Sequence, residues 1–227
     1  MFIRTRLLKI AKGNTTALVY NCPKRLRKAI TAQLLKYAEQ VGFVDGSRLE
    51  MMGGELCVNA TLAFASTLSK RGKLFASGIN GPVNYANNKT RTTICLPLKY
   101  KRICNILLFK GIGFMIANKK ISKIILSKLC KKYGLPAFGA INYKENNISP
   151  YVYVKETGSF VKETACGSGS IAFSIFSGKR KIIQPSGGVI YVRLGKRVRV
   201  SAQVTEDGEN NLFKSRKTSY SIKRGEK

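Results

Sequence analysis

The chain has 227 residues, with 41 lysines and arginines against 11 aspartates and glutamates, and a formal net charge of +30. Hydrophobic residues make up 44% of the chain, enough to bury a core, so disorder throughout is excluded. Histidine is absent, which excludes Ser-His-Asp triads, Cys-His dyads and histidine-ligated metal sites.

The first half begins with strand and helix signals in that order. Lys12-Gly13 precedes an apolar segment at 17–20, which predicts a strand. Apolar residues at helical spacing then follow, at Leu26, Ile30, Leu34 and Tyr37. Because glycine commonly ends a helix, we expect this one to stop near Gly42.

The second half repeats this order. Lys110-Gly111 precedes the apolar segment 114–116, and a helical pattern that stops at Gly134 follows. Its apolar positions are Ile121, Ile124, Ile125, Leu129 and Tyr133. Three later segments rich in β-branched and aromatic residues predict strands, at 151–154, 189–192 and 198–201.

Self-comparison indicates an internal duplication. When Cys57 is aligned with Cys166, an offset of 109 residues, segment 61–64 falls on 170–173 and Ser77-Gly78 falls on Ser186-Gly187. We therefore predict two similar domains, 1–102 and 103–210. Residues 211–227 are expected to form a basic tail with little to bury.

Cys57 and Cys166 each precede an apolar helical segment, so both thiols are expected at helix N-termini. There the helix dipole favours a thiolate and lowers the thiol pKa, and the free amides can bind a carboxylate. If the two helix ends meet, one sulfur can remove an α-proton while the other delivers a proton to the opposite face. That arrangement predicts racemisation of a free amino acid without an imine cofactor.

The remaining cysteines, Cys22, Cys95, Cys104 and Cys130, are interpreted as small buried hydrophobes. No two cysteines form a CxxC pair, so no metal site is expected.

The segment 163–170, Glu-Thr-Ala-Cys-Gly-Ser-Gly-Ser, resembles the second catalytic-cysteine motif of the diaminopimelate epimerase superfamily, and 54–61 resembles the first. The resemblance implies an α+β fold of two pseudo-symmetric domains, each a β-sheet wrapped around a central helix. It implies Cys57 and Cys166 as the acid/base pair in the interdomain cleft, with no cofactor. The residues implied to line the substrate site are Asn14, Gln40, Asn59, Glu163, Gly167 and Ser168.

Departures from the superfamily motifs bear on substrate and activity. No arginine precedes the second cysteine to hold a distal carboxylate, which disfavours diaminopimelate, and Glu163 together with Gly-Gly-Glu-Leu-Cys at 53–57 resembles the histidine racemase branch. Val58 replaces the glycine that the superfamily has after the first cysteine, and Gly113 stands where relatives often carry histidine. A degenerate or repurposed member therefore stays an alternative.

The cations are spread from Arg4 to Lys227 instead of forming one stripe, so nucleic-acid binding is the less favoured alternative. The first ten residues carry three cations and do not form a secretory signal, and the apolar stretch 103–117 is too short to span a bilayer. We expect a cytoplasmic protein with a free amino acid as its partner and no membrane contact. A homodimer stays open.

Overall fold

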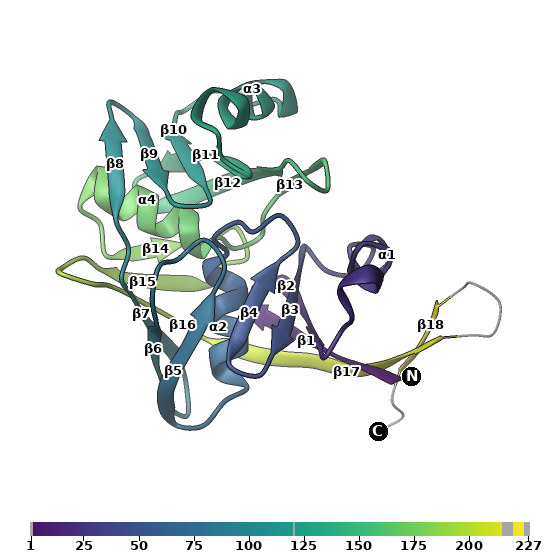
Figure 1. The fold of residues 1–227 in the computed structure, drawn as a ribbon. Coiled ribbons are helices and arrows are strands. Elements are labelled where there is room, and N and C mark those ends of the chain that lie inside the picture. Colours follow the sequence, from purple (N-terminus) through teal and green to yellow (C-terminus); the bar gives the residue numbers. More distant parts are fainter. Residues whose placement is uncertain (1, 120, 215–219, 225–227) are drawn as a thin grey trace.

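The structure, a computed structural model, describes residues 2–119, 121–214 and 220–224 (Figure 1). These residues form four helices and eighteen strands. The elements of the first half are β1 (Phe2–Ile10), β2 (Gly13–Tyr20), α1 (Lys24–Leu34), β3 (Gln40–Asp45), β4 (Arg48–Met51), α2 (Val58–Ser66), β5 (Arg71–Ala76), β6 (Val83–Asn87), β7 (Thr92–Leu96) and β8 (Tyr100–Ile103).

The second half continues with β9 (Ile106–Phe109), β10 (Gly113–Ile116), α3 (Lys123–Tyr133), β11 (Ala137–Lys144), β12 (Asn147–Val154), β13 (Ser159–Lys162), α4 (Gly167–Ser177), β14 (Lys181–Ile183), β15 (Val189–Arg193), β16 (Val198–Ala202), β17 (Val204–Lys214) and β18 (Tyr220–Arg224). Among the described residues, none of the helices combines the length and apolarity that crossing a membrane requires.

The two halves share one strand plan. Helix α1 connects the parallel strands β2 and β3, as α3 connects β10 and β11. An antiparallel neighbour follows in each half, β4 beside β3 and β12 beside β11. The strand after the central helix, β5 or β14, then pairs in parallel with that neighbour. The second half adds β13, which pairs antiparallel with β12 before the helix. This repeat confirms the predicted α+β fold of two pseudo-symmetric, sheet-dominated units.

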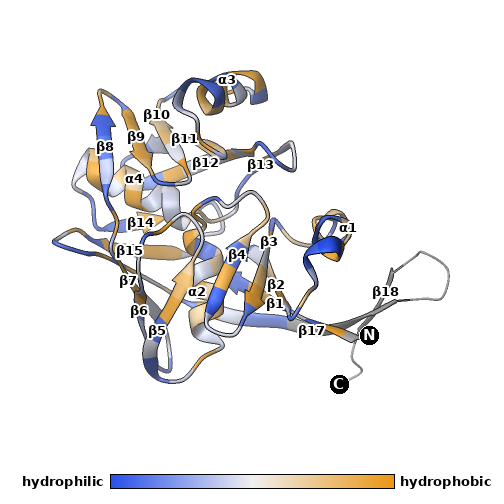
Figure 2. Ribbon diagram, in the orientation of Figure 1, coloured by the Kyte–Doolittle hydropathy of each residue, from blue (hydrophilic) through white to orange (hydrophobic). Residues whose placement is uncertain are grey.

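Each unit encloses one apolar helix. All residues at 58–65 in α2 and at 167–174 in α4 are buried, as expected for helices that are apolar on every side. Helices α1 and α3 instead lie outside the sheets and show both hydrophilic and hydrophobic residues (Figure 2). The N-termini of the two central helices meet between the halves.

Strands cross between the halves at their edges. Strand β8 pairs with β9 of the second half, and β17 returns to pair along β1 of the first. Strands β7 and β16 pair directly, so the strands of the two halves form one continuous sheet. The predicted domain limits stay a prediction. The segment expected as a basic tail begins within β17, whose backbone at 211–213 pairs with β1, and residues 220–224 form β18 beside it. Residues 215–219 and 225–227 lie outside the described residues.

One predicted helix end is wrong. Helix α1 ends at Leu34, and Gly42 lies inside β3, where a Cβ would meet Leu49 Cδ1 at 2.7 Å. Gly42 is therefore a packing glycine, not a helix stop. The second predicted stop is confirmed, since Gly134 caps α3 with the left-handed backbone that glycine adopts without strain.

Candidate active site

Cys57 and Cys166 line the same cavity between the halves, a space of about 50 Å³. Five more residues implied by the motifs line it with them: Gln40, Asn59, Glu163, Gly167 and Ser168. The sixth, Asn14, does not line the cavity and instead lies behind Gln40, to which it is hydrogen-bonded. The fold thus gathers segments that are distant in the sequence around two sulfur atoms.

Both thiols cap the helices that they precede. Cys57 is the N-cap of α2, and its Sγ accepts a hydrogen bond from the Ala60 amide at 3.4 Å. Cys166 is the N-cap of α4, and its Sγ accepts one from the Gly169 amide at 3.2 Å. The two sulfurs therefore occupy equivalent positions in the two halves, each facing the positive end of its helix.

Side chains of each helix cap the other helix. Asn59 Oδ1 accepts a hydrogen bond from the Gly167 amide at 2.9 Å, and its Nδ2 donates to the Ala165 carbonyl at 2.8 Å. Ser168 Oγ accepts from the Val58 amide at 3.3 Å. The first amide of each helix, expected to be free for a carboxylate, is thus already bonded across the cleft in this structure.

A chain of hydrogen bonds fixes the orientation of Gln40. The Glu39 carboxylate accepts from Asn14 Nδ2 at 3.0 Å, so Asn14 Oδ1 is left to accept from Gln40 Nε2 at 2.8 Å. Gln40 Nε2 also donates to Thr16 Oγ1 at 2.6 Å. The remaining atom, Gln40 Oε1, is an acceptor, and the Cys57 thiol donates a hydrogen bond to it at 3.1 Å. Cys57 is therefore held as a protonated donor.

The expectation that the helix ends lower both thiol pKa values is wrong for this state of the site. Burial raises the pKa of Cys57 and of Cys166 above the ordinary thiol value, and the nearby Glu163 carboxyl raises both further. The amide contacts of Ala60 and Gly169 act in the expected direction but are the smaller effect. Both sulfurs therefore rest as thiols.

Glu163 is a buried carboxyl beside the second thiol. It is 9% exposed, and its Oε2 has no hydrogen-bond partner among the described residues. Burial raises its pKa to about 8, its contact with Cys166 acts in the opposite direction, and the Glu39 charge raises the pKa further. This carboxyl is consequently able to exchange a proton near neutral pH.

Two further carboxyls line the cavity that the sequence did not single out, Glu39 and Glu55. Glu55 is buried, which raises its pKa. Their positions in the sequence could have predicted both as cavity residues, since Glu39 precedes Gln40 and Glu55 lies inside the first cysteine motif. Of the part of the chain that the structure describes, three acidic side chains and no lysine or arginine thus line this cavity. Among the described residues, no group of three or more Cys, Asp or Glu side chains is arranged to hold a metal ion.

Two of the three departures from the motifs, Val58 and Gly113, have a packing explanation. Val58 is buried against Gly167, where an added Cβ would lie 2.6 Å from Val58 Cγ1. The bulk at one helix end is thus accommodated by the lack of a side chain at the other. Gly113 lies in β10, where an added Cβ would meet the Phe138 ring at 2.3 Å. A histidine at 113 would not fit this packing.

Comparison with solved structures shows the fold. A protein from Pseudomonas aeruginosa described as a predicted epimerase superposes with a TM-score of 0.65, at 8% identity, over 94% of this chain and 100% of its own. A PhzF-family phenazine biosynthesis protein from Bacillus anthracis gives a TM-score of 0.62, at 12% identity, over 94% and 99%. No protein-family model matches the sequence.

Curated relatives of similar sequence show the class of enzyme to which this chain belongs. A histidine racemase from Fusobacterium nucleatum subsp. nucleatum is 33% identical over 247 residues, covering 88% of this chain and 93% of the relative. A histidine racemase from Staphylococcus aureus is 22% identical over 249 residues, covering 85% and 91%. Together with the epimerase-like fold, these relatives define an isomerase of the racemase and epimerase class. Within that class, the chain belongs to the histidine racemase family.

Proposed function

We propose that this isomerase interconverts the enantiomers of a free amino acid, histidine first among them, by proton transfer between Cα and two cysteine thiols without pyridoxal phosphate. The observation that carries the proposal is that Cys57 and Cys166, from equivalent helix ends, line one cavity. The lining residues also include no lysine that would form an imine with a cofactor.

The reaction balances with two sulfurs. One thiolate takes the α-proton from one face of Cα, and the resulting carbanion takes the proton of the other thiol on the opposite face. The enantiomer leaves with the first sulfur protonated and the second as thiolate, so the reverse reaction begins from the mirror-image state. Amides at the two helix ends would stabilise the enolate-like charge, with the substrate carboxylate taking the place of the Asn59 and Ser168 caps.

The two thiols are unequal before substrate arrives. Cys57 donates to Gln40, whose orientation is fixed, so Cys57 begins as the proton donor. Cys166 lies beside Glu163, and once this carboxyl is ionised it would accept the Cys166 proton and leave a thiolate as the base. The ammonium group of an amino acid entering this acidic cavity would favour ionised groups and lower the thiol pKa. Thiolate formation is then coupled to substrate binding.

The lining chemistry supports a substrate with hydrogen-bond donors on its side chain. Glu39, Glu55 and Glu163 supply acceptors, and no cation of the described residues lines the cavity to hold a second carboxylate. Histidine fits this chemistry, and the curated relatives are named histidine racemases. A cavity of about 50 Å³ holds only a few water molecules, so we expect the halves to move apart when an amino acid enters.

The test is exchange of the Cα hydrogen in deuterated buffer, followed by proton NMR with L-histidine and D-histidine. We expect wild type to exchange and racemise both. Cys57→Ser and Cys166→Ser should each lower racemisation at least about a thousandfold, because each removes one of the two proton carriers.

Cys95→Ser is the matched control, since Cys95 lies outside this cavity, and its rate should stay near that of wild type. If the enzyme exchanges the Cα hydrogen of another amino acid but not of histidine, the proposed substrate is wrong and the proposed mechanism stands. No exchange with any of the twenty amino acids would overturn the proposal.

A further inference from the structure

A second candidate site lies on the opposite side of the sheet that joins the halves. Two stretches, 56–144 and 164–205, contain no aspartate or glutamate at all. The fold brings these stretches together as six neighbouring strands in the order β5, β6, β7, β16, β15, β14 (Figure 1). Cations that are spread in the sequence are thereby collected on one sheet.

Strand register defines which residues share the outer face of this sheet. Residues that pair across adjacent strands point to the same side, and one such row crosses five strands. The row consists of Lys73, Asn84, Cys95, Arg199 and Arg193. A second row crosses all six strands through Arg71, Ala86, Thr93, Ser201, Tyr191 and Lys181. The residues that alternate with them, such as Leu74, Ile94 and Val200, are buried in the core.

We call these two rows the basic face. Six strands at about 4.8 Å spacing make it roughly 24 Å wide. It is hollowed in two adjoining places, of about 580 and 440 Å³, and Arg193 and Arg199 line both. Lys99, Lys196 and Arg197 add cations to the larger hollow, and Arg180 adds one to the smaller. Among the described residues, no carboxylate lines either hollow.

One aromatic ring lies among these cations. Arg91 stacks over the Tyr191 ring at 4.3 Å from its centroid, and its Nη2 contacts the Tyr191 hydroxyl at 3.4 Å. At the hairpin between β15 and β16, Arg197 Nη2 is anchored to the Pro82 and Cys95 carbonyls, while its buried Nε has no partner among the described residues. The larger hollow thus has an anchored arginine, and the smaller hollow has an aromatic ring that can stack.

We propose that the basic face binds single-stranded nucleic acid. Rows of cations without carboxylates match a phosphate backbone, and an aromatic ring paired with arginine is a surface on which bases stack. A duplex is disfavoured because this sheet presents no helix to enter a groove. An anionic bilayer is disfavoured because neither row carries a large aliphatic side chain to insert among lipids.

Fluorescence anisotropy with a labelled polyuridine strand of about 20 nucleotides, at about 50 and 200 mM salt, tests the proposal. We expect binding that weakens steeply with salt. The variant Arg91→Gln, Arg193→Gln, Arg199→Gln should bind at least about tenfold more weakly at low salt and should lower the salt slope by about 2, as expected for three lost single-strand phosphate contacts. Tyr191→Val should cost about tenfold through lost stacking.

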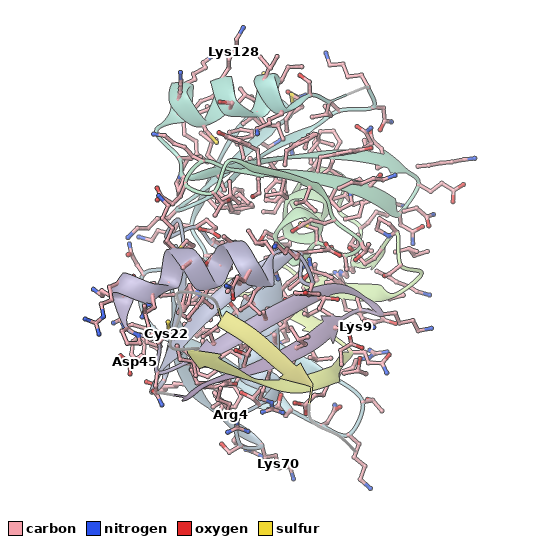
Figure 3. All side chains as sticks on the ribbon, turned by 90° about the vertical axis from the view of Figure 1, so that its right-hand side faces the viewer. Arg4, Lys9, Cys22, Asp45, Lys70 and Lys128 are labelled. Carbon is pink, nitrogen blue, oxygen red and sulfur yellow. The ribbon has the colours of Figure 1, made fainter. Side chains whose placement is uncertain are left out.

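The matched control removes three exposed cations from the outer helices, by Lys24→Gln, Arg25→Gln and Lys128→Gln. Lys128 lies on α3, at the end of the molecule opposite Lys70 (Figure 3). The control should weaken binding less than about twofold, and thermal unfolding should match among all variants. Equal weakening by the control would show generic attraction to a charge of +30 and would overturn the proposal. Binding to phosphatidylserine vesicles with none to polyuridine would overturn it as well.

Discussion

Gln40 controls one thiol through the direction of its amide. Because Nε2 has two acceptors, Asn14 and Thr16, the Oε1 atom has to face Cys57. In the proposed mechanism, this arrangement allows a residue that never carries charge to decide which sulfur begins as the acid.

Changing Gln40 to glutamate tests this role without changing the side-chain size. A carboxylate beside Cys57 would raise the thiol pKa by about one unit or more, so kcat should fall about tenfold or more while KM changes less. Steady-state kinetics over a range of pH measures both. Gln203→Glu, at an exposed position outside the cavity, should leave both constants unchanged. Equal effects of the two variants would remove the assigned role.

Glu163 should make stability depend on pH. Its pKa is about 8 in the folded chain and near 4.5 when unfolded, so between these values the folded state holds more protons. Stability should therefore fall as pH rises, by about 1.4 kcal/mol per pH unit from about pH 5 to 8. Urea unfolding at several pH values measures the slope, and Glu163→Gln should flatten it. Equal slopes in both proteins would contradict the raised pKa.

At the level of single residues, the sequence predicted the cavity well where a motif was continuous. Cys57, Asn59, Glu163, Gly167 and Ser168 lie in two short motifs, and the structure brings all of them to the cavity. The thiol pKa could not be predicted, because burial depends on how tightly the halves close. Glu39 could not be assigned because its contacts with Thr164 come from the other half.

At the level of elements, the two central helices depend on a close approach of their first residues. Gly167→Ala would push a methyl group against Val58 and Asn59, so we expect a loss of about 1–3 kcal/mol in unfolding free energy. Val58→Ala in the same chain should recover part of this loss, because it removes the methyl groups that clash. Urea unfolding measures the coupling.

Gly195→Ala is the control, since its Cβ would meet only Arg197 O, at 3.7 Å. It should change stability by less than about 0.5 kcal/mol. Additive effects of Val58→Ala and Gly167→Ala would show that the two residues do not compete for the same space.

Helix α1 shows where element boundaries escape sequence patterns. The spacing of Leu26, Ile30 and Leu34 is helical and the helix is present, but the pattern continued to Tyr37, which is 58% exposed. Pairing of β3 with β2 begins at Gln40 and ends the helical run earlier than the glycine suggested. Long-range strand pairing thus overrides local periodicity.

For the whole molecule, the strands that cross between the halves, β8 and β17, make each half depend on the other. A fragment of residues 1–102 would leave β1 without β17, so we expect it to lack cooperative urea unfolding. Mixing it with a fragment of residues 103–227 should restore a cooperative transition and the exchange activity. A fragment 1–102 that unfolds cooperatively alone would contradict this dependence.

The pairing of β1 with β17 also has a consequence for biosynthesis. The two strands lie about as far apart in the chain as any two elements, so β1 leaves the ribosome long before its partner is translated. Domains released early usually fold first during synthesis. In this chain the edge of β1 that pairs with β17 stays unpaired until β17 is translated. We expect a chaperone that binds the nascent N-terminal strand to protect this edge until translation ends.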